Sequence, residues 1–293
     1  MIQKYRKFVN NHNDNIFFVK DNLKYVKTVL YTRNVIWFLH ASLKKRGTHM
    51  ALLSDTPRIF WAGDSTVKQN DFTSYPQCGI GQGFSLFVRK EILIVNRAEN
   101  GRSTKSFIDE GRLEFIKENI REGDFLFVQF GHNDEKNDPL RYTEPQTSFK
   151  DNLRTFINVA RNAGAYPLLI TPLYRRLFES EGKLVDNTHL TYPQAMLEVG
   201  EECNVPVIDL CTMSRRKIEK TGDMDSRKWF MHLAPGEFPN YPEGKTDNTH
   251  LQYAGAVAFA ELIAAGIAKL DSPYRDMLVN PDDVKEDAAL LID

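Results

Sequence analysis

The chain has 293 residues, of which 42% are hydrophobic and 26% are charged, an ordinary composition for a globular protein. A net charge of −1 lacks the basic excess of a dedicated nucleic-acid-binding protein, and no run of about 20 apolar residues could span a membrane. Three widely spaced cysteines, Cys78, Cys203 and Cys211, fit neither a disulfide framework nor a zinc site. With no signal peptide recognised, these features predict a cytoplasmic protein.

The first part of the chain is basic. Residues 1–50 carry a net charge of +8, whereas residues 51–293 carry −9. Because residues 1–50 show no clean helical or strand period, we expect a basic N-terminal extension before a domain over 51–293. Codons for Lys45-Arg46-Gly47 can spell a purine-rich ribosome-binding sequence, so we hypothesise that native translation starts at Met50. Detection of residues 1–49 in the native protein would contradict this hypothesis.

From residue 57 onward, short apolar runs alternate with segments of helical length. The sequence predicts helices over 106–120 and 147–164, and Gly164 closes the second of these. The predicted strands cover residues 58–63, 92–98, 124–131, 166–173 and 205–210. Nearly continuous apolar strands are typical of a parallel sheet covered on both faces. The pattern therefore predicts an α/β, doubly wound three-layer α/β/α sandwich with about five parallel strands.

Polar residues follow the first three predicted strands. Ser65 follows the first strand, Gly101 the second and Asn133 the third. Ligands of doubly wound folds bind outside the carboxyl ends of the strands, so these residues are candidates for a site. Each also has a structural interpretation, because serine caps helices, Asn-Gly forms turns and asparagine favours loops.

The pentapeptide Asp-Asn-Thr-His-Leu occurs twice, at 186–190 and at 247–251. Both copies place a histidine three residues after an aspartate, a common pairing of a base with the carboxylate that orients it. The second copy precedes an apolar segment of helical length. We expect His250 to open this helix, which would pack flat against the sheet and hold the imidazole near the carboxyl edge.

The order Ser, Gly, Asn and Asp-x-x-His resembles the SGNH (GDSL-type) hydrolases, and specifically their rhamnogalacturonan acetylesterase branch. The resemblance covers roughly residues 57–270 and rests on GDST, ENGRST, GHND and the second DNTH. It implies a flavodoxin-like SGNH hydrolase fold with Ser65 as nucleophile, His250 as base and Asp247 as the residue that orients the base. It also implies an oxyanion hole formed by the backbone N–H groups of Ser65 and Gly101 and the amide of Asn133. No metal or cofactor is expected.

Further residues are candidates for binding substrate. Arg175 and Arg176 follow the fourth predicted strand and could receive the carboxylates of an acidic sugar, although arginines on loops are most often solvated. His189 belongs to the first copy of the pentapeptide and could line the cleft or serve a structural role. The segment 227–245 predicts either a sugar-stacking wall or an Ω-like loop packed by its own side chains. The candidates in this segment are Trp229, His232, Phe238 and Tyr241.

The resemblance implies an esterase that removes O-acetyl groups from carbohydrate, specifically from rhamnogalacturonan or pectin-derived oligosaccharides inside the cell. An acetylated carbohydrate is therefore the expected partner, without nucleic acid or membrane, and no oligomeric state is predicted. One alternative is a lipid esterase or thioesterase that prefers longer acyl chains. Others are a non-catalytic carbohydrate-binding protein and a flavodoxin-like electron carrier, which would be coloured. We interpret Cys78, in a glycine-rich loop after Ser65, as structural.

Overall fold

The computed structural model describes residues 30–32, 35–37, 56–179 and 182–279. The chain divides into two units, residues 1–55 and 56–293. In the first unit, β1 (Leu30–Thr32) pairs antiparallel with β2 (Val35–Trp37). Strands of three residues are too short to produce a detectable period, which explains why the sequence predicted none here. The remainder of residues 1–50, including Met50, lies outside the described residues.

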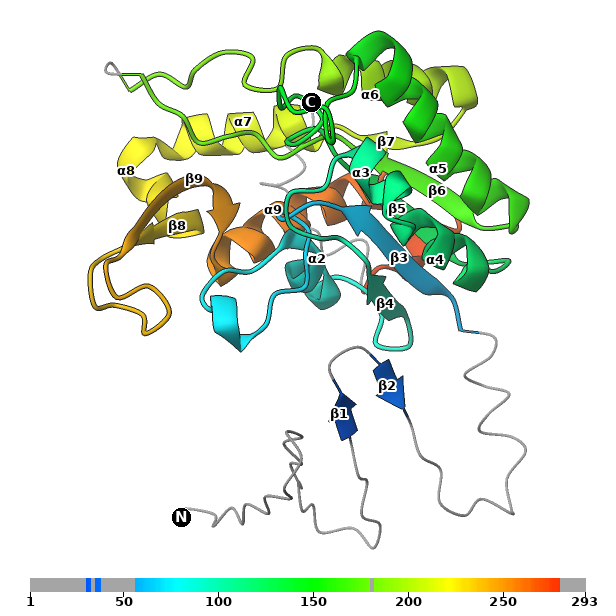
Figure 1. Cartoon of the computed structure of the whole chain (residues 1–293), viewed down its shortest axis with the longest axis horizontal. Helices are drawn as coiled ribbons and strands as arrows, with labels where there is room; N and C mark the ends of the chain where they lie inside the picture. The colour runs from blue at the N-terminus through cyan, green and yellow to red at the C-terminus, as the bar shows by residue number, and fades with distance from the viewer. Residues whose placement is uncertain (1–29, 33–34, 38–55, 180–181, 280–293) are drawn as a thin grey trace, which may run out of the picture. The chain divides into compact units, whose positions relative to one another are not determined.

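The second unit is built on a five-stranded parallel sheet in the order β4-β3-β5-β6-β7 (Figure 1). Its strands are β3 (Arg58–Gly63), β4 (Leu93–Asn96), β5 (Phe125–Gln129), β6 (Tyr166–Ile170) and β7 (Val207–Ile208). The predicted fold class and all five predicted strands are confirmed, with some strands shorter than expected. In order of appearance the arrangement is 2-1-3-4-5, in which ligands bind where the chain reverses direction across the sheet.

Alternate side chains of the strands enter two separate apolar cores. In β3 and β5, Ile59, Trp61 and Phe127 pack into one core, whereas Phe60 and Val128 pack into the other. This alternation follows from the period of two in a strand. Because both faces of β3 and β5 are covered, their sequences are nearly continuous apolar runs. Full burial of one such side chain contributes roughly 1.5–3 kcal/mol, so the two cores hold the sheet rigid beneath its carboxyl edge.

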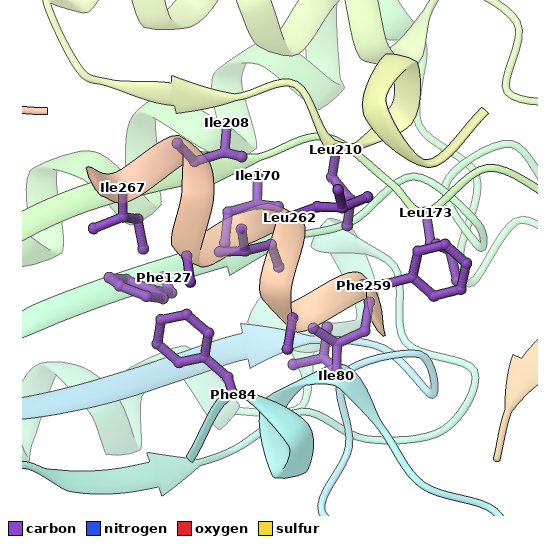
Figure 2. Close-up of a cluster of buried hydrophobic side chains, with 14 of the residues drawn as sticks. Ile80, Phe84, Phe127, Ile170, Leu173, Ile208, Leu210, Phe259, Leu262 and Ile267 are labelled. Atoms are coloured by element: carbon purple, nitrogen blue, oxygen red, sulfur yellow. The ribbon is translucent and has the colours of Figure 1, made fainter. Parts of the chain in front are cut away.

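The first core lies under α2 (Ile80–Gly83), α7 (Leu210–Thr221) and α9 (Tyr253–Ala268). Figure 2 shows Leu262 and Ile267 of α9 among side chains of the sheet, whereas the ring of Phe259 extends toward Leu173, just after β6. The apolar and small-residue character of α9 allows it to pack against the sheet as predicted, with ten of its residues buried.

The second core lies under α3 (Thr104–Asp109), α4 (Arg112–Asn119), α5 (Lys150–Asn162) and α6 (Tyr192–Cys203). The prediction of one helix over 106–120 was wrong, because Gly111 has a φ of 72° and ends α3 before α4 begins. The prediction over 147–164 is confirmed for α5. Short 3₁₀ or π segments complete these layers: Phe72–Ser74, Phe84–Leu86, Pro145–Phe149, Arg227–Trp229 and Arg275–Met277.

A two-stranded antiparallel sheet lies outside the main sheet, next to α8 (Asp223–Ser226) (Figure 1). It consists of β8 (Phe230–Leu233) and β9 (Lys245–Leu251). The prediction that His250 opens a helix was therefore wrong: His250 lies in β9, and α9 begins only at Tyr253. β9 pairs with β8 at Lys245, Thr246 and Leu251, and the register shifts between these pairs. In the irregular stretch between them Asp247 accepts from the amides of Thr249 and His250, which keeps 247–250 out of the helix.

No helix among the described residues has both the length and the apolarity needed to cross a lipid bilayer.

Candidate active site

Ser65 is presented by a tight turn that begins directly after β3. The amides of Val67 and Lys68 both donate to the carbonyl of Asp64, at 3.2 and 3.1 Å, which closes one helical turn around Ser65. Asp64 and Thr66 are buried, whereas Ser65 is partly exposed. The turn therefore offers a serine hydroxyl to solvent at the carboxyl edge of the sheet.

Three side chains form one hydrogen-bonded chain across this turn and β9. The Oγ of Ser65 lies 2.9 Å from Nε2 of His250, and Nδ1 of His250 lies 2.7 Å from Oδ2 of Asp247. An ionised carboxylate can only accept, so the Nδ1 atom carries the proton and Nε2 is left to accept from the serine hydroxyl. Ser65 and His250 are 185 residues apart in the sequence and meet only in the folded chain.

Asp247 is held in place by the backbone of its own strand. Its Oδ1 accepts from the amides of Thr249 and His250, at 2.8 and 2.9 Å, and Lys245 Nζ lies 3.3 Å from its Oδ2. Burial alone would raise the pKa of Asp247, but the hydrogen bonds and charge of His250 and the amide of Thr249 outweigh it and hold the pKa below its usual range. Asp247 therefore remains ionised and can stabilise a cationic His250.

The N–H groups of Ser65, Gly101 and Asn133 lie at the same edge of the sheet, and each has a proton that is not used in a hydrogen bond within the described residues. Within residues 56–179 and 182–279, neither the Ser65 nor the Gly101 backbone N–H is engaged in a hydrogen bond. Gly101 has a φ of 74°, and a Cβ built on it would contact nothing within 4 Å, so its backbone is open. Asn133 is 7% exposed and uses one amide proton on the carbonyl of Arg102, at 3.1 Å. Its second amide proton is left for a ligand.

A buried aspartate that sequence reasoning did not assign ties two of these loops together. Asp134 Oδ1 accepts from the backbone N–H of Thr104 at 3.0 Å, from Thr104 Oγ1 at 2.5 Å and from Thr143 Oγ1 at 3.0 Å. Burial raises the pKa of Asp134 to about 7, although these hydrogen bonds favour the ionised form. Its place directly after Asn133 was the available signal, but the contact with Thr104 spans 30 residues and no local pattern reveals it.

A second buried aspartate lies beneath the turn that presents Ser65. Asp64 Oδ1 accepts from the amide and the hydroxyl of Thr66, at 2.9 and 2.8 Å. Burial raises the pKa of the Asp64 carboxyl above its usual range, against the effect of these bonds. Asp64 thus stabilises the turn through its hydrogen bonds to Thr66. Its position beside Ser65 in the GDST motif was the only sequence signal for this role.

The two arginines predicted to bind substrate donate to residues of this chain. Arg175 forms an ion pair with Glu135 and donates to the carbonyls of Thr188 and His132, at 2.6 and 3.3 Å.

Arg176 is 3% exposed and forms an ion pair with Asp223. It also donates to Ser226 Oγ at 2.9 Å and Asn248 Oδ1 at 2.7 Å. The donors that the sequence analysis assigned to a sugar carboxylate are thus occupied by internal partners.

His189, from the first copy of the pentapeptide, is buried beneath the site. Its Nε2 lies 2.8 Å from the carbonyl of Leu173, and its Nδ1 lies 3.4 Å from Oε2 of Glu135. The ring packs edge-on against His132, with centroids 4.5 Å apart. Burial and the charges of His189 and Arg175 hold the pKa of His132 well below its usual range. Only the second copy of the pentapeptide contacts Ser65.

Trp229 and His232 do not belong to a sugar-stacking wall, one of the two interpretations left open for the segment 227–245. Trp229 is 8% exposed and packs edge-on against Phe259 of α9, with centroids 5.5 Å apart. His232 Nε2 lies 2.7 Å from Oδ1 of Asn248, and burial lowers its pKa despite this bond. Trp229 therefore packs against α9 and His232 contacts β9, and the two do not form an open aromatic surface.

Two loops near the site join through other aromatic residues. The ring of Tyr75 packs against Phe238 with centroids 5.7 Å apart, and the hydroxyl of Tyr241 donates to the carbonyl of Ser74 at 3.2 Å. Phe72, in the same loop as Tyr75, is 91% exposed. The predicted sugar-stacking residues Phe238 and Tyr241 are thus partly exposed but already engaged by the neighbouring loop.

In the described ranges, no group of three or more His, Cys, Asp or Glu side chains is arranged to hold a metal ion. The geometry instead places a serine, an oriented imidazole and a set of free N–H donors together, which is an arrangement suited to acyl transfer. A model described as the GDSL-like Lipase/Acylhydrolase family matches residues 62–258, more than half of the chain. The chain belongs to this family. The GDSL-type resemblance predicted from the four motifs is therefore confirmed.

Two relatives within this family are about 40% identical to the chain over most of its length. Rhamnogalacturonan acetylesterase RhgT of Bacillus subtilis (strain 168) is 41% identical over 223 residues, covering 76% of this chain and 94% of RhgT. Probable rhamnogalacturonan acetylesterase YesY of the same organism is 40% identical over 222 residues, covering 75% of this chain and 97% of YesY. The predicted resemblance to the rhamnogalacturonan acetylesterase branch is confirmed at this level of identity.

Solved structures agree with the fold. The crystal structure of the Bacillus subtilis protein YxiM has a TM-score of 0.59 and 28% identity, covering 70% of this chain and 54% of that chain. This chain therefore spans about half the length of that structure. LAE5, an alpha/beta hydrolase enzyme from the metagenome of Lake Arreo, Spain, has a TM-score of 0.50 and 15% identity, covering 74% of this chain and 97% of that chain. At that identity the likeness shows the fold alone.

Proposed function

We propose that this chain is a serine esterase that removes O-acetyl groups from carbohydrate, specifically from rhamnogalacturonan or pectin-derived oligosaccharides. The observation that carries the proposal is the hydrogen-bonded chain from Ser65 through His250 to Asp247, with distances of 2.9 and 2.7 Å. Unused N–H donors at Ser65 and Gly101 support it. We also propose that the imported oligosaccharide is deacetylated in the cytoplasm.

The geometry suits a two-step transfer of the acetyl group. Ser65 Oγ attacks the acetyl carbonyl carbon while His250 Nε2 takes the hydroxyl proton. The resulting oxyanion accepts hydrogen bonds from Ser65 N–H, Gly101 N–H and Asn133 Nδ2. His250 then returns the proton to the departing sugar hydroxyl as the carbon–oxygen bond of the ester breaks, which leaves an acetyl group on Ser65.

The second step repeats the chemistry with water. His250 Nε2 takes a proton from a water molecule, whose oxygen attacks the acetyl-enzyme carbonyl. Collapse of the second oxyanion returns the proton from His250 to Ser65 Oγ and releases acetic acid, which loses its remaining proton to solvent and becomes acetate. Asp247, kept ionised by its hydrogen bonds, stabilises the imidazolium in both steps.

The substrate class is supported by the relatives rather than by a bound ligand. RhgT and YesY, both about two-fifths identical to this chain over almost their full lengths, are named for rhamnogalacturonan acetyl esters. Arg175 and Arg176 are occupied by Glu135 and Asp223, so we propose that they position loops of the cleft and do not bind sugar carboxylates directly. We give His189, Trp229 and His232 the same supporting role.

The proposal is tested by hydrolysis of p-nitrophenyl esters from acetate to octanoate, with wild type and Ser65→Ala in parallel. We expect the acetate to be hydrolysed best, and Ser65→Ala to lower kcat by at least about 10³-fold because no nucleophile remains. Arg154→Met, a change at a surface residue of α5, serves as the control and should retain full activity.

Two outcomes would contradict the proposal. Preference for octanoate would favour a lipid esterase or thioesterase on the same scaffold. Equal and negligible rates for wild type and Ser65→Ala, together with sugar binding, would favour a non-catalytic carbohydrate-binding protein.

A further inference from the structure

We infer that Arg141 is a positioning residue for the oxyanion hole: its guanidinium fixes the side-chain amide of Asn133 and keeps Asn133 Nδ2 directed at the substrate. This inference rests on the proposed function, because it concerns the same acyl-transfer site. Arg141 lies outside the four motifs that identify the family in this sequence.

The contacts form a short chain that ends at the oxyanion donor. Asp138 Oδ2 accepts from Arg141 Nε at 2.7 Å, and Arg141 Nη1 donates to Asn133 Oδ1 at 3.4 Å. Asn133 Nδ2 in turn donates to the carbonyl of Arg102 at 3.1 Å. The side-chain amide of Asn133 is thus hydrogen-bonded at both ends. Its oxygen accepts from Arg141, and its nitrogen donates to the loop that carries Gly101.

The loop after β5 is folded so as to return Arg141 to Asn133. The amides of Arg141 and Tyr142 donate to the carbonyl of Asp138, at 2.9 and 2.7 Å, and the amide of Leu140 donates to Asp138 Oδ1 at 3.0 Å. Asp138 therefore organises a tight turn with its backbone and side chain together. The turn brings residue 141 back to residue 133, eight positions earlier in the chain.

The physical need for Arg141 comes from the symmetry of an amide side chain. The final torsion of asparagine is broad and roughly two-fold, so an unrestrained amide samples orientations with either its oxygen or its nitrogen toward the substrate. An amide oxygen facing a developing oxyanion would repel it. A cationic donor on Oδ1 favours the productive orientation, because a guanidinium has only donors and cannot pair with Nδ2.

The positive charge of Arg141 is a second reason to expect a lower kcat when this residue is lost. The guanidinium places a positive charge one side chain away from the position where negative charge develops during acyl transfer. In a partly desolvated cleft such a charge stabilises the transition state more than the neutral ester. Both effects predict that loss of Arg141 lowers kcat with little change in KM.

The first measurement is the kinetics of p-nitrophenyl acetate hydrolysis by Arg141→Met. We expect kcat to fall about 10- to 100-fold with KM nearly unchanged, because the loss is confined to the transition state. Arg141→Lys retains the charge but not the planar fork, and it should recover part of the loss. If Arg141→Met fails to fold, Arg141→Lys carries the same comparison.

Arg154→Met is the matched control. Arg154 forms an ion pair with the aspartate three residues earlier at 2.7 Å, as Arg141 does, and the two arginine side chains are 38% and 34% exposed. Arg154 lies on α5, where its other ion-pair partner is Glu202 of α6 at 2.6 Å, and we expect the kcat of Arg154→Met to equal that of wild type.

A double-mutant cycle with Asn133→Ala separates positioning from a general structural effect. Once the amide is absent Arg141 has no side chain to orient and only the direct effect of its charge remains, so Arg141→Met should lower kcat much less in the Asn133→Ala background than in wild type. Full additivity of the two changes, or an Arg141→Met variant as active as wild type, would overturn the inference. Absence of Ser65-dependent turnover in wild type would instead overturn the proposed function, and this inference with it.

Discussion

At the scale of single residues, Asp247 illustrates how the site maintains a charge in a partly buried position. Its two oxygens accept from the His250 ring and from two backbone amides, and Lys245 lies nearby. These donors outweigh the effect of burial and lower the pKa of Asp247 in the folded chain. Since the folded pKa lies below the usual value of 3.8, ionised Asp247 stabilises the folded state.

Because the pKa of Asp247 is lower in the folded chain, the stability of wild type relative to Asp247→Asn should depend on pH. The stabilising contribution is fully present above pH 3.8 and is lost as the pH falls from 3.8 through the lowered folded pKa. We therefore expect wild type to be more stable than Asp247→Asn at pH 5 and 7, and the difference to shrink as the pH falls below 3.8. Urea unfolding of both proteins across this range measures it. A difference in free energy of unfolding that stays constant down to pH 2.5 would contradict the account.

At the scale of elements, α2 and the nucleophile turn pack with their backbones in contact. The amide of Ile80 donates to the carbonyl of Thr66 at 2.7 Å, and that of Gly81 donates to the carbonyl of Val67 at 3.2 Å. A Cβ at Gly79 would lie 2.2 Å from the carbonyl oxygen of Lys68. The glycine-rich segment after Ser65 is therefore required for the backbone of α2 to support the turn that presents the nucleophile.

Gly79→Ala should consequently reduce both stability and activity. Because the obstructing atoms belong to the backbone, the turn itself must shift, and we expect a loss of about 1–3 kcal/mol in the free energy of unfolding. We also expect kcat to fall by about 10-fold or more, since the serine moves relative to His250. Denaturant unfolding and ester kinetics test both effects.

Gly266→Ala provides the matched control for Gly79→Ala. The three atoms nearest to a Cβ at Gly266, in α9, would belong to the Ile208 side chain, the closest at 2.8 Å, so no backbone of the turn has to shift. It should cost less stability and leave kcat unchanged. Equal effects on kcat at both glycines would show that the turn is not specifically supported by α2.

The parts of the site that could be predicted from the sequence are those with local signals. Ser65, Gly101 and Asn133 each follow an apolar strand, and Asp247 and His250 lie three residues apart in one motif. The internal partners of the arginines could not be predicted in this way. Arg175 pairs with Glu135 over 40 residues, and Arg176 with Asp223 over 47, so only the tertiary structure shows that these donors are occupied.

The same distinction applies to the elements. The five sheet strands could be predicted because their apolar runs are nearly continuous, which in β3, β5 and β6 follows from burial on both faces. The split between α3 and α4 and the placement of His250 in β9 depend on competing interactions. A left-handed glycine breaks the first helix, and pairing with β8 retains residues 245–251 in a strand.

At the scale of the whole molecule, the elements that carry the candidate catalytic residues lie in the second unit. Among the described residues, both apolar cores and all five residues of the candidate machinery fall between 56 and 279. We therefore propose that residues 51–293 form the hydrolase domain. A chain beginning at Met50 should have the kcat and the melting temperature of the full chain. A marked loss of either quantity would show that residues 1–49 belong to the folded enzyme.

The most direct test of the central claim is the release of acetate from acetylated rhamnogalacturonan oligosaccharides by wild type and by Ser65→Ala. Acetylated xylan oligosaccharides serve as the comparison substrate. We predict that wild type releases acetate from rhamnogalacturonan in preference to xylan, and that Ser65→Ala releases none above background because the acyl acceptor is gone. No release by wild type, or equal release by Ser65→Ala, would contradict a serine acetylesterase acting on this polysaccharide.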